Sequence, residues 1–157
     1  MTGGFALSGK DSMAATAVSV SKAFAHSGSY SLAVTVKAQG SKRKFEVALP
    51  ICGGGTGFAV GTGQFVTAWF YVVPDATSTE RPPATSAFGQ HLTTSAGDVA
   101  MLSINSTVAT WFQITTPITN VGSQITKLAV EGSFGAAGES SSYDWTGTIY
   151  VDDIALQ

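Results

Sequence analysis

Apolar and polar residues alternate along most of this chain, which is the period of a β-strand with one buried face. The clearest case is Phe65–Val73, where every second residue from Val66 to Val72 is apolar. Similar alternation predicts further strands at Ala15–Ser21, Tyr30–Lys37, Lys44–Leu49, Phe88–Thr93, Val99–Ile104, Thr110–Thr116, Ile125–Phe134 and Gly147–Leu156. No segment carries the i, i+3, i+4 apolar stripe of an amphipathic helix. Short strands separated by glycine-marked turns predict an all-β protein, a β-sandwich of two antiparallel sheets.

One domain is expected to span residues 1–157. The length fits, since single domains usually have about 100–200 residues, and neither an internal repeat nor a linker interrupts the strands. Pro74–Ala87 is predicted to be a long surface loop between strong strands. Cys52–Gly63 is rich in glycine, but the Lys-Ser/Thr pair and the helix that a phosphate loop requires do not follow it. This segment is therefore interpreted as a flexible loop that can line the rim of a binding cleft.

Charged residues make up only 11% of the chain, and the formal net charge is −2. So few basic residues argue against a nucleic-acid partner, and no apolar run reaches the roughly 18–20 residues of a membrane span. The low charge and the 18 Ser and 19 Thr residues favour a secreted, extracellular protein. Cys52 is the single cysteine, so no intrachain disulfide is expected. The N-terminus shows no signal peptide, as expected either for a cytosolic protein or for a module of a larger secreted protein. The Gly-rich start and the end at Gln157 directly after a strand pattern favour the module.

The sequence offers little for catalysis. His26 and His91 are the two histidines, and neither a GxSxG nucleophile elbow nor an HExxH metal motif is present. Glycoside hydrolysis needs two facing carboxylates. Glu46 and Glu131 lie on predicted strands and are candidates for such a pair, although a solvated surface carboxylate is the simpler interpretation of each.

Two aromatic residues on one strand are the most informative candidates for a binding site. Trp69 and Tyr71 share the face opposite Phe70, roughly 6.5–7 Å apart, and Trp111 and Gln113 repeat this pattern on another strand. Exposed aromatic residues in a row usually mark a site. Pyranose rings stack their apolar C–H faces on flat aromatic rings, and their hydroxyls need amide, hydroxyl or carboxylate partners. The alternative is that the strand phase is reversed and these tryptophans belong to the core.

Trp145 precedes the last predicted strand and is placed in a loop. The ring is expected either at the rim of the binding site or as a plug over one end of the sandwich. The alternation within the last strand shifts by one residue. Ile149 and Val151 are two positions apart, but the next apolar residue, Ile154, follows three positions after Val151. A β-bulge at Asp152-Asp153 produces this pattern. Adjacent acids at a bulge can bind Ca²⁺ together with main-chain carbonyls, or remain solvated.

Four segments resemble a known family in the order in which they occur. His26-Ser27-Gly28-Ser29-Tyr30-Ser31-Leu32, Val66-Thr67-Ala68-Trp69-Phe70-Tyr71-Val72, Trp111-Phe112-Gln113-Ile114 and Gly147-Thr148-Ile149-Tyr150-Val151-Asp152-Asp153-Ile154 are similar to strands of jelly-roll carbohydrate-binding modules of plant-cell-wall-degrading enzymes. The resemblance implies a jelly-roll sandwich without catalysis of its own, linked to a glycoside hydrolase domain. Members of the chain-binding kind use a concave sheet with aromatic and polar groups.

The resemblance also implies a structural calcium ion with Asp152 as a ligand. Members often supply a second ligand from a Glu after the Phe of the first strand, but here Phe5 is followed by Ala6. Asp11 or main-chain carbonyls of the Lys22–Ser29 loop would then replace it. The predicted ion would clamp the C-terminal strand to the N-terminal region.

The sequence thus predicts a non-catalytic carbohydrate-binding module that takes β-1,4-linked glucan chains such as cello-oligosaccharides, mixed-linkage β-glucan or xyloglucan. The predicted ligand-binding residues are Trp69, Tyr71, Trp111, Gln113, Glu131 and Trp145. A small jelly-roll glycanase or lyase, and a structural or adhesion domain without glycan affinity, are the alternatives.

Overall fold

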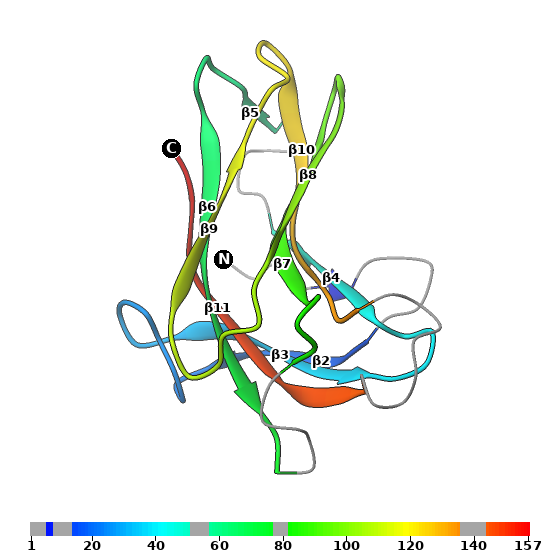
Figure 1. Cartoon of the computed structure of the whole chain (residues 1–157). Coiled ribbons are helices and arrows are strands. Elements are labelled where there is room, and N and C mark those ends of the chain that lie inside the picture. The colour runs from blue at the N-terminus through cyan, green and yellow to red at the C-terminus, as the bar shows by residue number, and fades with distance from the viewer. Residues whose placement is uncertain (1–5, 8–13, 51–56, 77–81, 136–143) are drawn as a thin grey trace.

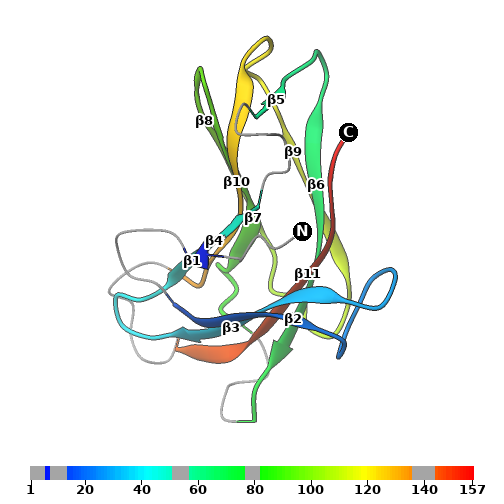
Figure 2. The same cartoon turned by 180° about the vertical axis from the view of Figure 1, so that it is seen from behind.

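The computed structural model describes residues 6–7, 14–50, 57–76, 82–135 and 144–157. Eleven strands form two antiparallel sheets within these ranges. Figures 1 and 2 show the sheets packed face to face, from opposite sides. The all-β jelly-roll sandwich predicted from the sequence is confirmed. In the described part of the chain, no helix is long and apolar enough to cross a membrane.

Sheet A has the strand order β1-β4-β10-β7-β8, with β5 paired to one end of β10. Its strands are β1 (Ala6–Leu7), β4 (Lys44–Leu49), β5 (Phe58–Ala59), β7 (Ala87–Thr94), β8 (Gly97–Ile104) and β10 (Gln124–Ser133). Sheet B has the order β2-β3-β11-β6-β9. Its strands are β2 (Ala15–Ser21), β3 (Ser31–Ala38), β6 (Phe65–Pro74), β9 (Phe112–Pro117) and β11 (Trp145–Leu156).

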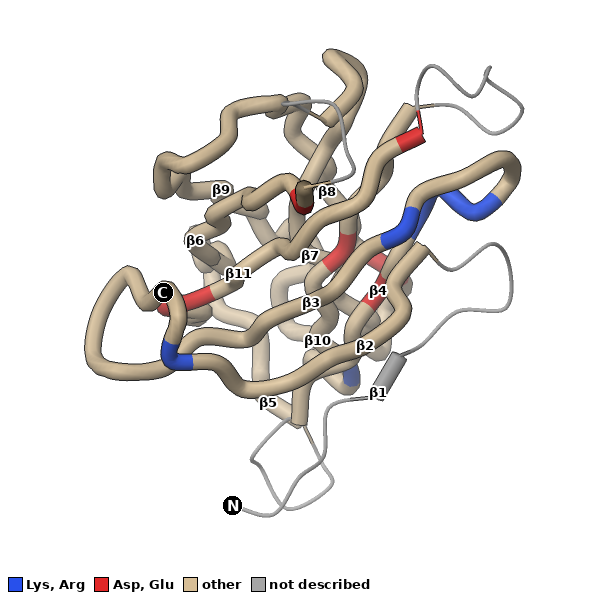
Figure 3. Tube along the Cα trace, turned by 90° about the horizontal axis from the view of Figure 1, so that it is seen from below, with Lys and Arg blue, Asp and Glu red and all other residues tan. Residues whose placement is uncertain are grey.

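The loops predicted from the sequence differ from the observed ones in detail. The two-residue strand β5 (Phe58–Ala59) lies within the predicted loop Cys52–Gly63, of which residues 51–56 are outside the described ranges. The predicted loop Pro74–Ala87 is bounded by β6 and β7, and its residues 77–81 are likewise outside. Charged residues are sparse along the trace, and most of the described Lys and Arg residues lie where β3 meets β4 (Figure 3).

The core forms between the inner faces of the two sheets, and the predicted phase of β6 is confirmed. Phe70 is fully buried and packs against Phe88 of sheet A and Phe112 of β9, each with ring centroids 5.9 Å away. Trp69 and Tyr71 are half-buried and face outward from the same strand. Because successive side chains of a strand alternate between faces, this one strand supplies both core and surface groups.

Trp145 is a correction to the sequence-based prediction. The residue is the first of β11 rather than part of a loop, and it pairs with Ala38 of β3. Its ring is 1% exposed and stacks on Phe134 with centroids 5.0 Å apart, so it belongs to the core and not to a binding rim. Gly147 makes room for it, because a Cβ there would lie 2.5 Å from the indole ring.

The β-bulge predicted at Asp152-Asp153 is confirmed. The register between β11 and β6 shifts between Asp152 and Ala155, and Asp153 has a φ of 47°. A left-handed backbone is uncommon for residues other than glycine, although Asp and Asn adopt it more readily than most. The bulge turns both carboxylates toward the segment between β2 and β3.

Candidate functional site

The outer face of sheet B carries a set of packed aromatic rings, which we call the sheet B aromatic cluster. Its members are Phe24, His26, Trp69, Tyr71, Trp111 and Tyr150. His26 stacks on Trp69 with centroids 3.9 Å apart and an interplanar angle of 15°. Phe24 stacks on Tyr71 at 4.8 Å. The predicted platform of Trp69 and Tyr71 is therefore present, but rings from the β2–β3 connection already pack against it.

Trp111 belongs to this cluster and Gln113 lies beside it, as the sequence suggested. The Trp111 ring contacts Tyr71 at 5.2 Å and the edge of His26 at 5.4 Å. Gln113 is exposed on β9 and pairs with Trp69 in the register of the two strands. Four of the predicted site residues thus share one face. The sequence did not indicate that Phe24 and His26 would stack on two of them.

The bulge acids fix the position of the β2–β3 connection. Asp152 Oδ2 accepts hydrogen bonds from the backbone N–H of His26 at 2.8 Å and of Ser27 at 3.2 Å, and Oδ1 accepts the N–H of Asp153 at 2.8 Å. The Asp153 carboxylate bonds the His26 ring through Nδ1 at 2.7 Å and accepts the Ser27 hydroxyl at 2.5 Å. These bonds to His26 and Ser27 hold the pKa of Asp153 below its usual value.

Both Asp152 oxygens accept hydrogen bonds from N–H groups. Calcium takes six to eight oxygen ligands, and each Asp152 oxygen keeps a second lone pair with which a cation can be bound. Asp11, the alternative ligand considered from the sequence, lies outside the described residues. Structural calcium stays a prediction of the resemblance, and the hydrogen bonds by themselves hold the β2–β3 connection to β11.

A chelation experiment separates the two accounts of this clamp. We expect EDTA to leave the melting temperature of the wild-type protein unchanged, and Asp152→Ala to lower it by roughly 2–8 °C. Three partly exposed backbone N–H groups, those of His26, Ser27 and Asp153, would lose their acceptor, at a cost of about 1–2 kcal/mol in total, and each kcal/mol shifts the midpoint by about 2–4 °C at this size. Asp152→Asn is the matched control, because it keeps one acceptor oxygen. A fall in EDTA that added Ca²⁺ reverses would establish the ion instead.

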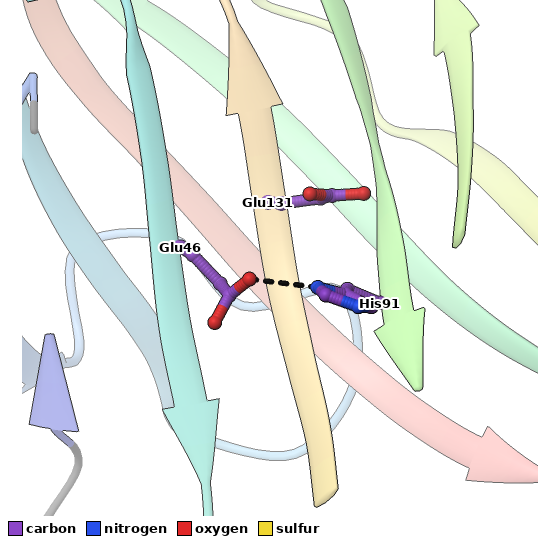
Figure 4. A group of neighbouring side chains, drawn as sticks. All are labelled: Glu46, His91 and Glu131. Atoms are coloured by element: carbon purple, nitrogen blue, oxygen red, sulfur yellow. Dashed lines mark hydrogen bonds and ion pairs between the residues drawn. The ribbon is translucent and has the colours of Figure 1, made fainter. Parts of the chain in front are cut away.

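The outer face of sheet A carries a polar group of a different kind, the Glu46–His91–Glu131 cluster. The three side chains project from β4, β7 and β10 toward one another (Figure 4), and one ligand-type atom of each lies within 4.8 Å of the others. His91 Nδ1 lies 2.8 Å from Glu46 Oε2, and His91 Nε2 lies 3.5 Å from Asp98. The Lys127 ammonium bonds the other oxygen of Glu46. All three cluster residues are half-buried.

Burial and charge shift two pKa values in this cluster. Burial raises the pKa of Glu131, and the nearby Glu46 charge adds to this, against the opposing effects of His91, Lys44 and Lys127. Burial alone would lower the pKa of His91, but its hydrogen bond with Glu46 and the surrounding carboxylates outweigh burial and raise it. Among the described residues, Glu131 has no hydrogen-bond or ion-pair partner.

Small residues surround the cluster on the same face. Cross-strand pairing forms one row of Glu46, Glu131, Gly89 and Leu102, and a neighbouring row of Ala48, Ala129, His91 and Ala100. Leu102 and Ile104 of β8 are exposed at the edge of this face. A ligand lying on sheet A would therefore meet polar groups in its middle and an apolar edge, with Ala48 and Ala100 accessible beside the polar groups and Gly89 and Ala129 buried.

The predicted site residues are not brought together. Glu131 lies on the outer face of sheet A, whereas Trp69, Tyr71, Trp111 and Gln113 lie on sheet B. A single site combining the aromatic residues with Glu131 is thus wrong, because the core separates the two outer faces. The sequence allowed Glu46 and Glu131 to face each other, and in the structure the two are cross-strand partners. No local motif pointed to His91, Lys127 or Asp98 as their neighbours.

The sequence matches no protein-family model and no curated protein sequence at a significant level. Solved structures, in contrast, match over nearly the whole chain. The fold is that of carbohydrate-binding modules.

A module described as specific for non-crystalline cellulose, CBM28, superimposes with a TM-score of 0.69 at 14% identity, covering 98% of this chain and 87% of that one. CBM27-1 of Caldicellulosiruptor saccharolyticus, solved with mannohexaose, gives 0.65 at 16% identity over 96% and 87%. A third structure, from work on the promiscuous specificity of β-sandwich carbohydrate-binding modules, gives 0.64 at 22% identity. This chain is covered completely in that match and spans 58% of the other chain. At these identities the likeness establishes the fold.

Proposed function

We propose that this protein is a non-catalytic carbohydrate-binding module that takes a β-1,4-linked glucan chain on the outer face of sheet A. The observation that carries the proposal is the half-buried Glu131 carboxylate, which has no partner among the described residues. Sugar hydroxyls donate hydrogen bonds to such an acceptor, and bonds to a charged group are among the stronger ones.

The surroundings of Glu131 suit a sugar ring. Binding sites usually combine an apolar surface with a few placed polar groups that fix orientation. Here His91 and Lys127 offer donors beside the Glu131 acceptor, and Leu102 offers apolar area to the C–H face of a pyranose. Ala48 and Ala100, in the cross-strand row of His91, are small and accessible, and they let a flat chain approach the sheet.

Sheet B is the less favourable face for the same ligand. A sugar ring needs a free aromatic face to stack on. His26 covers one face of Trp69, and Phe24 covers one face of Tyr71. Opening the platform would break the bonds of Asp152 and Asp153 to the β2–β3 connection. We therefore assign the sheet B aromatic cluster a structural role and sheet A the binding role.

A binding screen with two matched variants tests this assignment. Affinity gels and titration calorimetry with cello-oligosaccharides, mixed-linkage β-glucan and xyloglucan should show binding by the wild type. Glu131→Ala should weaken it by about 10- to 150-fold, because a hydrogen bond to a charged group contributes about 1.5–3 kcal/mol and each 1.4 kcal/mol is tenfold. Glu131→Gln keeps an acceptor and should lose less. Trp69→Ala should bind as the wild type does, and a selective loss in Trp69→Ala would move the site to sheet B.

The proposed role in a larger protein is to hold a linked glycoside hydrolase at its substrate outside the cell. Two structures with this fold belong to much longer enzyme chains. One is an exo-β-agarase, of which this chain covers 22%, and the other is a xylanase with CBM22-1 and GH10 modules bound to xylohexaose, of which it covers 24%. Fusion to a hydrolase and secretion are proposed on that basis.

Hydrolysis by this chain is the second candidate, because Glu46 and Glu131 are cross-strand partners. Retaining glycosidases place two carboxyl groups about 5–5.5 Å apart. Glu46 is held by His91 and Lys127 at the same time, which leaves neither of its oxygens free to act as nucleophile. We expect no new reducing ends when the protein is incubated at high concentration with any glucan that it binds. Activity that Glu131→Gln abolishes would establish an enzyme.

A further inference from the structure

The Glu46–His91–Glu131 cluster has the composition of a metal site as well as of a hydrogen-bonding surface. An imidazole nitrogen and two carboxylate oxygens from three adjacent strands lie within 4.8 Å of one another. Imidazole nitrogen and carboxylate oxygen together suit Zn²⁺ and its neighbours in the transition series, whereas Ca²⁺ and Mg²⁺ prefer oxygen alone.

A second observation concerns the two nitrogens of His91. Nδ1 faces Glu46 at 2.8 Å, while Nε2 faces the Asp98 carboxylate at 3.5 Å. Metal-binding histidines usually donate the other ring N–H to a carboxylate, which fixes the ring and its tautomer. In the structure Nδ1 donates to Glu46, so a metal ion bound at Nδ1 would replace that proton, and the remaining ring N–H, on Nε2, would face Asp98.

The cluster carries charges of both signs. Three carboxylates, those of Glu46, Asp98 and Glu131, face the His91 imidazole, and Lys44 and Lys127 lie near Glu131. Lys127 bonds Glu46 through Oε1, which leaves Oε2 facing His91. The Glu131 carboxylate has no counterion in contact among the described residues, and an ion between the three groups would neutralise it.

We propose that a divalent transition-metal ion of the Zn²⁺ type binds between Glu46 Oε2, His91 Nδ1 and Glu131, with water at its open position. Ligand atoms about 2.0–2.2 Å from a tetrahedral ion lie about 3.4 Å apart. The three ligand atoms, which lie within 4.8 Å of one another, would adjust to this spacing on binding the ion. The bound ion joins β4, β10 and β7, and it shares Glu131 with the proposed glycan site, so the ion and the sugar would compete for that carboxylate.

Zn²⁺ titration of the tag-free chain by calorimetry tests the proposal. We expect one Zn²⁺ per chain, with His91→Gln and Glu131→Gln each weakening binding at least tenfold. Asp98→Asn should weaken it by about 10- to 100-fold, as loss of a ligand's carboxylate partner does. His26→Gln is the control for the other histidine and should bind as the wild type does. Absorption of the Co²⁺-loaded protein in the visible range should vanish in His91→Gln.

Two outcomes would overturn the site. One is the absence of Zn²⁺ binding to a folded wild-type protein at millimolar ion, and the other is binding that survives His91→Gln or is lost in His26→Gln. Thermal unfolding of each variant without metal shows that it is folded. Glycan affinity is measured in EDTA and Zn²⁺ affinity without glycan, so failure of the metal proposal is distinguishable from failure of the glycan proposal.

Discussion

Replacing Phe70 with alanine is expected to lower the free energy of unfolding by about 3–5 kcal/mol, the usual cost of truncating a buried phenylalanine. Phe70 is fully buried between the sheets and packs against Phe88 and Phe112. Its removal leaves a cavity that rings on two other strands line, and close-packed interiors relax only partly around such cavities. Chemical denaturation followed by tryptophan fluorescence measures the loss.

Trp69→Ala is the matched control, because it changes the adjacent position on the same strand. Trp69 faces outward and stacks on His26 rather than on the core. Its truncation should cost clearly less than that of Phe70 and should loosen the β2–β3 connection. If Trp69→Ala cost as much as Phe70→Ala, or if Phe70→Ala unfolded at the wild-type denaturant midpoint, the division of β6 into a buried and an outer face would be wrong.

Which residues of β6 face the core was predictable, because the sequence of that strand alone determines it. Alternate residues of a strand face opposite sides, so a run such as Val66 to Val72 assigns its own faces without knowledge of any other strand. The bulge at Asp152-Asp153 was predictable for the same reason, since inserting a residue shifts the apolar phase. Strand bounds at β2 and β4 agree with the alternation to the residue.

The site required information that no local pattern contains. Glu46 and His91 are 45 residues apart in sequence and become neighbours only through the register of β4, β10 and β7. That register depends on the packing of both sheets, so neither a spacing motif nor alternation identifies the cluster. The covering of Trp69 by His26 is equally non-local, because it depends on how Asp152 holds the β2–β3 connection.

Trp145 shows how a strand start is missed. The sequence pattern predicts that a strand begins at Gly147, and it assigns Trp145 to the preceding loop. In the structure the missing side chain at Gly147 is what admits the indole, so the glycine and the ring form one packed unit inside β11. The loop assignment of Trp145 left open whether the ring lies at the rim or plugs one end of the sandwich, and the burial of the ring excludes the rim.

Gly147→Ala should therefore lower the stability of the protein more than a glycine-to-alanine substitution in a strand usually does. The added methyl would lie 2.5 Å from the Trp145 ring and 2.4 Å from the Val73 carbonyl oxygen. The carbonyl belongs to the backbone of β6 and cannot turn away, so overpacking of this kind costs about 1–3 kcal/mol or more. Equilibrium denaturation measures the loss, and unchanged stability would mean that the indole does not occupy this space.

Trp145→Ala is expected to cost about 3–5 kcal/mol, as for other large buried aromatics, and to leave glycan affinity unchanged once the protein is folded. The ring is 1% exposed and stacks on Phe134, so it cannot reach a ligand. Trp145→Phe keeps an aromatic ring and removes an indole N–H that has no hydrogen-bond partner among the described residues. A buried unpaired donor costs about 1–3 kcal/mol, so its loss offsets much of the cavity that the smaller ring leaves. Trp145→Phe should then stay close to wild-type stability. A Trp145→Ala protein that unfolds normally but fails to bind glucan would return this residue to the binding site.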